Sequence, residues 1–260
     1  MRKLTMLVGA SRSGSSFIYR SWFENFRTSE KYFVPTIKEM QFLVNMRSIE
    51  RRKALEEQHI KRHGNLLEKE IKFINNYINV ITLEDYINLW PNNKISFDCT
   101  PNHCLATKDQ IQTLEPYLHS VGFVMRNPFT REISAIKRLL DYRERYRDID
   151  PLEHINFQRN ISNYDNIVKK WSNICKDRFQ THFFENIGSL DWVNNFNRKL
   201  QIDTIESVSN FCNESIVSNI PKEYIQELKT YNLEHVKKMQ CITNEIKDKW
   251  LEEISAYEYA

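Results

Sequence analysis

The segment "GASRSGSS" (9–16) has the residue types and the spacing that suit the binding of an anion. It follows an apolar run at 4–9 and precedes "SSFIYRSWFENF" (15–26), which has the periodicity of a helix. A loop that joins a strand to a helix exposes unpaired N–H groups at the positive end of the helix dipole. Two serine hydroxyls and the charge of Arg12 would add to such a site. We therefore expect this loop to hold a phosphate or a similar anion.

The loop differs from the one that ATP- and GTP-binding proteins use, which has the pattern G-x-x-x-x-G-K-[ST]. The two glycines have the right spacing and Ser16 occupies the Ser/Thr position, but Ser15 stands where the lysine would be. That lysine reaches the outer phosphates of a triphosphate, so its loss argues against ATP or GTP hydrolysis. Arg12 supplies positive charge from inside the loop instead. The alternative is a plain strand–turn–helix connection with an arginine on its surface.

A second candidate anion site lies in "VGFVMRNPFTREIS" (121–134). Arg126 follows an apolar strand, and Ser134 falls on the helix that we expect next. A strand-end arginine and a hydroxyl on the following helix can converge on one phosphate, to which the guanidinium offers charge and bidentate geometry. The alternative is an arginine near a helix start with an unrelated surface serine.

Together the two segments resemble the donor-binding motifs of sulfotransferases that use 3′-phosphoadenosine-5′-phosphosulfate (PAPS). "GASRSGSSF" resembles their 5′-phosphosulfate loop, and "FVMRNPFTREIS" resembles their 3′-phosphate motif, R-D-P-x-x-R-x-x-S. Arg126, Pro128, Arg131 and Ser134 match that motif, and Asn127 replaces the aspartate. PAPS carries two separate anionic groups, which explains two anion sites without a lysine. The resemblance assigns donor binding to Arg12, Ser13, Gly14, Ser15, Ser16, Phe17, Arg126 and Ser134.

Two further segments resemble the Golgi-type carbohydrate sulfotransferases and their bacterial relatives. "KEMQFL" (38–43) is similar to a K-E-x-x-F-F segment whose glutamate is the base, and "FDCTP" (97–101) is similar to a segment near the acceptor. The resemblance implies that Glu39 is the catalytic base. In the same reaction Arg12 is expected to stabilise the leaving 5′-phosphate, and Lys38 to contact the sulfuryl group. It places the acceptor near Asp98, Thr100 and His103. The alternatives are an ordinary amphipathic helix start at Glu39 and a capping or surface role for His103.

Strands that alternate with helices must position these residues. The alternation indicates an α/β fold with a mostly parallel sheet flanked by helices, and ligands bind such sheets beyond the carboxyl ends of the strands. The resemblance implies a three-layer core like that of P-loop NTPases, in a single domain over 1–260 with a helical insertion on the acceptor side at about 40–90. Strands are expected at 4–9, 31–35, 93–101, 120–128 and 178–187, and residues 36–90 are expected to be mostly helical.

Composition excludes several classes of partner. With 37 basic and 34 acidic residues the net charge is +3, which argues against nucleic acid as the main partner. The runs at 47–53 and 142–148 could attract an anionic glycan, although solvated helix faces are the simpler interpretation. The N-terminal apolar run is too short for a signal peptide or a membrane span. Five cysteines without C-x-x-C spacing indicate reduced thiols and a cytoplasmic protein.

These patterns predict an enzyme that moves a sulfuryl group from PAPS to a hydroxyl acceptor, a small molecule or a carbohydrate, and releases 3′,5′-adenosine bisphosphate. No metal is expected, because arginine and lysine supply the positive charge. One alternative is a small-metabolite kinase with a degenerate loop, for which Asp98 is the only candidate Mg²⁺ ligand at a strand end. Another is a non-catalytic nucleotide-binding protein.

Overall fold

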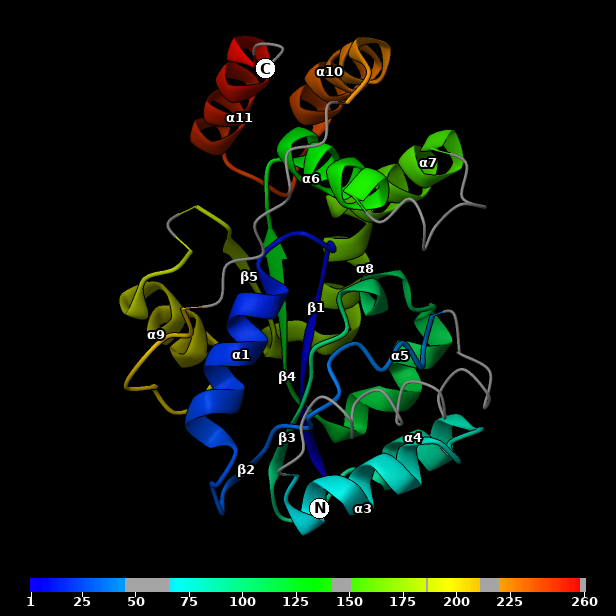
Figure 1. Ribbon diagram of the computed structural model, residues 1–260, viewed down its shortest axis with the longest axis vertical. Coiled ribbons are helices and arrows are strands. Elements are labelled where there is room, and N and C mark those ends of the chain that lie inside the picture. The colour runs from blue at the N-terminus through cyan, green and yellow to red at the C-terminus, as the bar shows by residue number, and fades with distance from the viewer. Residues whose placement is uncertain (45–65, 142–150, 186, 211–219, 258–260) are drawn as a thin grey trace.

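A five-stranded parallel sheet forms the centre of the computed structural model, which describes residues 1–44, 66–141, 151–185, 187–210 and 220–257. In this part of the chain the strand order is β2-β3-β1-β4-β5, with every adjacent pair parallel (Figure 1). All carboxyl ends therefore lie at one edge of the sheet. The strands are β1 (Lys3–Gly9), β2 (Tyr32–Phe33), β3 (Ile95–Asp98), β4 (Leu118–Met125) and β5 (Phe179–Phe183).

Helices cover both faces of the sheet, so that the fold has three layers. Side chains alternate along β1: Leu7 packs with α1 and α9 on one face, whereas Met6 and Val8 pack with the remaining helices on the other. The expected α/β core, like that of P-loop NTPases, is thereby confirmed. The helices are α1 (Ser15–Phe26), α3 (Glu68–Tyr77), α4 (Leu83–Leu89), α5 (Lys108–Leu114), α6 (Pro128–Asp141), α7 (Pro151–Ser162), α8 (Tyr164–Cys175), α9 (Leu190–Lys199), α10 (Lys222–Lys238) and α11 (Asn244–Ala256).

Several elements begin or end at positions other than those expected. Helix α6 begins at Pro128, because the side chain of Asn127 accepts a hydrogen bond from the Phe129 N–H at 3.1 Å and so starts the helix. Helix α7 was not expected as a separate element. It ends before Asn163, whose side chain caps the next helix by accepting from the Asn166 N–H at 3.5 Å.

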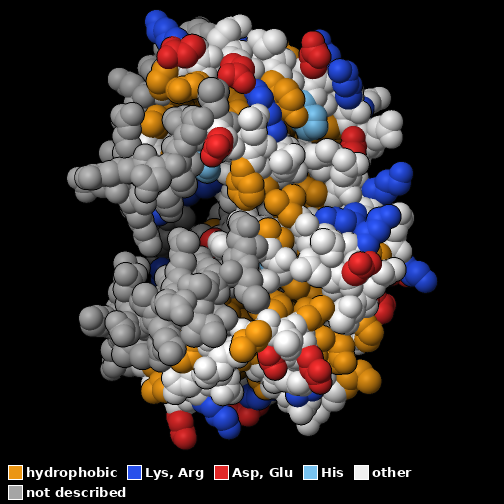
Figure 2. All heavy atoms as spheres, turned by 90° about the vertical axis from the view of Figure 1, so that its right-hand side faces the viewer, with side chains coloured by type: hydrophobic (Ala, Val, Ile, Leu, Met, Phe, Trp, Pro, Cys, Tyr) orange, Lys and Arg blue, Asp and Glu red, His pale blue; other side chains and the backbone are white. Residues whose placement is uncertain are grey.

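The expected helical insertion is only partly helical among the residues described. Residues 36–44 have no regular structure, whereas α3 and α4 account for much of 68–89. Residues 45–65 and the two charged runs noted above lie outside the described part of the chain. On the face drawn in Figure 2, basic and acidic side chains lie among one another, and a hollow opens at mid-height beside the undescribed residues. None of the described helices is long and apolar enough to cross a membrane.

Candidate functional site

The loop between β1 and α1 has the features of an anion site. Helix α1 starts after Gly14, which has a left-handed backbone (φ 79°) and provides no side-chain cap for the first N–H groups of the helix. A Cβ on Gly14 would also lie 2.1 Å from Cδ1 of Ile187, so both conformation and space favour glycine. Next to it, the hydroxyl of Ser13 is buried and has no hydrogen-bond partner among the residues that the structure describes. Uncapped amides and an unpaired hydroxyl are what an anion at this helix start would satisfy.

Arg126 stands directly after β4, at the carboxyl edge of the sheet. Its Nη1 donates to the carbonyl oxygen of Arg12 at 2.9 Å, and its Nε donates to Oγ1 of Thr130 at 3.3 Å. Its guanidinium also lies over the ring of Phe184, 4.5 Å from the centroid. Both the loop and the segment after β5 therefore hold Arg126 in place.

The two motifs meet through Arg12. Its Nε donates to Oγ of Ser134 at 2.9 Å, while its own carbonyl accepts from Arg126. Ser134 belongs to α6, so one residue of the first loop contacts both residues that the second motif contributes. Arg12 has a left-handed backbone (φ 69°), which is uncommon for a residue with a side chain. The two predicted anion sites are thus neighbours that share Arg12.

Positive charge accumulates here. Burial lowers the pKa of Arg126, and the nearby charges of Arg12 and Arg131 lower it further. Cations that depress one another's pKa are stabilised by a bound anion. The arrangement therefore favours a ligand with several negative charges.

Asn127, the residue that replaces the aspartate of the motif, connects this anchor to the C-terminal helix. Its Nδ2 donates to the carbonyl oxygen of Trp250 at 3.2 Å and to Oε2 of Glu253 at 2.9 Å. An aspartate at this position would place its carboxylate against that of Glu253. The amide of Asn127 therefore suits the acceptor oxygens that α11 presents to it.

The predicted base, Glu39, lies in the irregular segment 36–44 and has a left-handed backbone (φ 65°). Its carboxylate is 40% exposed and contacts the ammonium group of Lys38, which is 15% exposed. The pair joins a partly accessible carboxylate to a mostly covered cation. Glu39 could therefore accept a proton from a ligand.

A cavity of about 880 Å³ brings most of the predicted residues together. Among the described residues that line it, the charged ones are three arginines and one carboxylate, that of Glu39. Five of the predicted residues are not in its lining. They are Ser13 and Lys38, next to lining residues in the sequence, and the buried Asp98, Thr100 and His103. The predicted residues that line the cavity are Arg12, Gly14, Ser15, Ser16, Phe17, Glu39, Arg126 and Ser134.

Asp98, Thr100 and His103 form a buried group of their own. Each is at most 1% exposed, and none lines the cavity. The hydroxyl of Thr100 donates to Oδ1 of Asp98 at 2.5 Å, the hydroxyl of Tyr86 contacts Oδ2, and Nδ1 of His103 lies 3.4 Å from Oδ2. The structure therefore places these three residues where they contact one another rather than the cavity.

Helix α7 supplies a wall of the cavity that the sequence patterns did not indicate. His154 and Gln158 line it, and Oε1 of Gln158 accepts from the Ser11 hydroxyl at 3.4 Å. The fully buried Arg131 fixes this wall by donating to Oε1 of Gln158 at 2.6 Å and to Oγ of Ser162 at 2.5 Å. The second arginine of the motif is thus a buried support between α6 and α7.

Other lining residues also escaped the sequence patterns. The sequence could have indicated them only through their position in the chain, because several directly follow β5 or precede the undescribed residues 211–219. They are Arg138 and Ala135 on α6, Phe184, Ile187 and Gly188 after β5, and Val208, Ser209 and Asn210.

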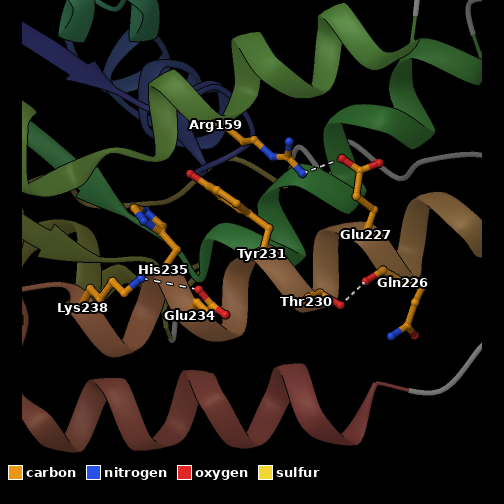
Figure 3. Close-up of a pocket in the computed structure, with 8 residues that line it drawn as sticks. All are labelled: Arg159, Gln226, Glu227, Thr230, Tyr231, Glu234, His235 and Lys238. Carbon is orange, nitrogen blue, oxygen red and sulfur yellow. Dashed lines mark hydrogen bonds and ion pairs between the residues drawn. The ribbon is translucent and has the colours of Figure 1, made fainter.

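A second cavity, of about 500 Å³, lies against α10 (Figure 3). Its charged side chains are engaged with one another: Nη2 of Arg159 is 2.8 Å from Oε1 of Glu227, and the guanidinium lies 4.3 Å from the centroid of Tyr231. Nζ of Lys238 likewise lies 3.5 Å from Oε2 of Glu234. None of the predicted site residues lines this cavity, so the larger one is the candidate site.

The fold is similar to that of two solved sulfotransferases. The crystal structure of a sulfotransferase from Alicyclobacillus acidocaldarius matches with a TM-score of 0.57 and 16% identity, over 98% of this chain and 96% of that chain. The sulfotransferase domain from the curacin biosynthetic pathway matches with a TM-score of 0.54 and 12% identity, over 100% and 99%. No family model and no curated protein matches the sequence. The likeness establishes the fold, which is the one that the two motifs predicted.

Proposed function

We propose that this protein is a sulfotransferase that moves a sulfuryl group from PAPS to a hydroxyl acceptor. One observation carries the proposal: the two anion-binding motifs, far apart in the sequence, meet in one cavity through the contacts of Arg12 with Ser134 and Arg126. A ligand with two separate anionic groups fits such an arrangement. The sulfotransferases with the same fold support it.

The residues present suit this donor. The amides at the start of α1, with the hydroxyls of Ser15 and Ser16, would hold the 5′-phosphosulfate. Arg126 and Ser134 would hold the 3′-phosphate, and Arg12 lies between the two groups. When bound, PAPS supplies the sulfuryl group and leaves as 3′,5′-adenosine bisphosphate.

Glu39 would take the proton from the acceptor hydroxyl, and Lys38 would contact the sulfuryl group. The chemistry resembles phosphoryl transfer, in which positioning and electrostatic stabilisation dominate. Because Arg12 and Arg126 supply the positive charge, the proposed reaction needs no metal ion. The acceptor would be a carbohydrate or another small hydroxyl compound, as the similarity of 38–43 to carbohydrate sulfotransferases suggests. Nucleic acid has no part in this proposal.

The cysteines support the proposed cytoplasmic location. Within the described ranges the free cysteines are Cys99, Cys104, Cys175 and Cys241. Burial raises the pKa of all four thiols and so disfavours the reactive thiolate. For Cys175, burial is the one cause, and it raises the pKa to about 12. These thiols suit a reducing compartment.

The kinase alternative fits the site less well. Ser15 occupies the position of the lysine, and Asp98, the candidate Mg²⁺ ligand, is buried against Tyr86, Thr100 and His103. A metal ligand for a nucleotide would have to face the cavity, which the carboxylate of Asp98 does not line.

Thermal-shift titrations with 3′,5′-adenosine bisphosphate, ADP and ATP, with and without Mg²⁺, test the proposal. A ligand at one hundred times its Kd stabilises the folded protein by about 2.7 kcal/mol. We expect stabilisation by the bisphosphate alone and its loss in Arg126→Ala, whereas Arg198→Ala, on the exposed side of α9, should respond like the unaltered protein. Stabilisation by Mg-ATP only would support the kinase and refute the proposal.

A further inference from the structure

The segment that carries Glu39 has an unfavourable backbone conformation. Glu39 and Gln41 have φ values of 65° and 53°, in the left-handed region that residues with side chains seldom adopt. Such conformations persist only when the surrounding structure fixes them, and they cluster at functional sites. The contacts around residues 36–44 should therefore show what holds the glutamate in place.

Tyrosine hydroxyls fix the start and the middle of this segment. The hydroxyl of Tyr19 lies 2.8 Å from the carbonyl oxygens of both Pro35 and Thr36. The hydroxyl of Tyr77, on α3, donates to the carbonyl oxygen of Met40 at 2.6 Å. Met40 directly follows Glu39, so Tyr77 acts on the peptide unit next to the predicted base.

A histidine and a glutamine fix the other end. The N–H of Leu43 donates to Nε2 of His103 at 3.3 Å, and the Leu43 carbonyl accepts from Nε2 of Gln110 at 3.0 Å. Because Nε2 of His103 accepts this bond, the neutral ring carries its proton on Nδ1. This atom faces Oδ2 of Asp98 at 3.4 Å, without a regular hydrogen bond to any described residue. Burial lowers the pKa of His103 and so keeps the ring neutral.

We propose that Tyr77 and His103 are positioning residues for Glu39, and that the buried group of Asp98, Thr100 and Tyr86 orients His103 for this task. The inference rests on the proposed function. Neither Tyr77 nor His103 lines the cavity, so both would act through the backbone at Met40 and Leu43. The residues after β3 that were expected near the acceptor would thus act on Glu39 through the backbone of its segment, not through the cavity.

Four variants test this role. Tyr77→Phe removes one hydroxyl and keeps the ring, and His103→Leu removes the acceptor atom. His103→Gln is the conservative partner, because the glutamine oxygen can take the place of Nε2. Tyr32→Phe is the matched control, since Tyr32 is equally buried and its hydroxyl accepts from the Asp203 N–H at 2.8 Å, on the opposite side of the sheet from this segment.

Three quantities are measured: hydrogen exchange of the Leu43 amide, the Kd for 3′,5′-adenosine bisphosphate, and sulfate release from PAPS with water as the acceptor. In that reaction a water oxygen bonds to sulfur, the bond from sulfur to the 5′-phosphate oxygen breaks, and Glu39 takes the water proton. Misplacement of a catalytic group by about 1 Å can cost roughly a hundredfold in rate. We expect Tyr77→Phe and His103→Leu to speed exchange about tenfold and to slow sulfate release about 10- to 100-fold, with Kd changed less than about twofold.

His103→Gln should restore most of the rate, and Tyr32→Phe should match the unaltered protein. Unchanged exchange and sulfate release in Tyr77→Phe and His103→Leu would overturn the inference, as would an equal loss of rate in Tyr32→Phe. Failure of the proposed function has a different signature: the unaltered protein would bind no bisphosphate, while the exchange of Leu43 would still respond to the variants.

Discussion

At the scale of single residues, Arg12 links the two halves of the site. Its carbonyl receives the guanidinium of Arg126, and its own guanidinium reaches Ser134. Main chain and side chain of one residue therefore set the spacing between the two proposed anion sites. A lysine, with a single ammonium group, could not offer the same planar set of donors.

Replacement of Glu39 by glutamine should separate binding from chemistry. The amide keeps the size of the side chain but cannot take a proton, so we expect the rate of sulfuryl transfer to fall by about 10²- to 10⁴-fold. The Kd for 3′,5′-adenosine bisphosphate should stay within about twofold, since Glu39 contributes no positive charge to donor binding. Calorimetry and an assay of bisphosphate release measure the two quantities. Glu223→Gln, at an exposed position of α10, is the control, and full activity in Glu39→Gln would remove Glu39 as the base.

Some residues of the candidate site can be predicted from the sequence, and others cannot. The loop at 9–16 and Arg126 are local signals, because strand ends and helix starts determine what they can bind. Gln158 and His154 carry no such signal, since only the packing of α7 against α6 brings them to the cavity. The burial of Asp98 and His103 is likewise a property of the tertiary structure. It keeps these expected acceptor residues out of the lining of the cavity.

At the scale of elements, β4 and α9 pack closely at a glycine. A Cβ on Gly122 would lie 2.5 Å from Cζ of Phe196, a ring that is fully buried. Helix α9 can therefore approach the sheet only where β4 has no side chain. The same sequence feature, a glycine within an apolar strand, often marks such a close approach.

Gly122→Ala should destabilise the protein by about 1–3 kcal/mol, because the ring of Phe196 and the helix that carries it must move. The midpoint of urea unfolding measures the change. Gly9→Ala is the control: its Cβ would meet the nearest atoms of Val124 at 3.5 Å, an ordinary contact, so we expect a smaller effect. Equal stability of Gly122→Ala and the unaltered protein would show that α9 adjusts without cost.

Element prediction fails where tertiary contacts override local preference. Residues 36–44 were expected to be helical, yet hydrogen bonds from Tyr77 and to His103 hold them in an irregular path. The long strands β1 and β4 were predicted well, because their apolar runs are buried on both faces of the sheet. The pattern of the sequence thus indicates the scaffold better than the segment that carries Glu39.

At the scale of the whole molecule, stability should depend on pH through His182, which is partly buried. Burial lowers the pKa of His182 from 6.5 to about 4, and the charge of Lys199 contributes to the shift. The folded state then binds fewer protons than the unfolded state between these values, so acidification from pH 6.5 to about 4 removes stability. At about 1.36 kcal/mol for each pKa unit, the loss for this group is at most about 3 kcal/mol.

Urea unfolding at pH 7 and at pH 4.5 measures this dependence. Because His182 stacks on the ring of Phe196 at a centroid distance of 5.3 Å, His182→Phe keeps an aromatic ring and removes the titrating group. We expect the stability lost on acidification to be smaller in His182→Phe. His119→Phe, at a partly exposed position of β4, provides the matched control, and identical pH dependence in all three proteins would contradict the shift at His182.

The position of β1 in the sheet sets a condition on how the protein is made. β1 leaves the ribosome before β3 and β4, the two strands with which it pairs, and β4 ends only at Met125. At a synthesis rate of about 5–20 residues per second, the nascent strand waits on the order of ten seconds for its second neighbour. Its apolar surface is open during that time, and the loop that follows it cannot meet Ser134. The proposed donor site, which needs Ser134 as well as the loop at 9–16, can therefore form only after α6 has been synthesised.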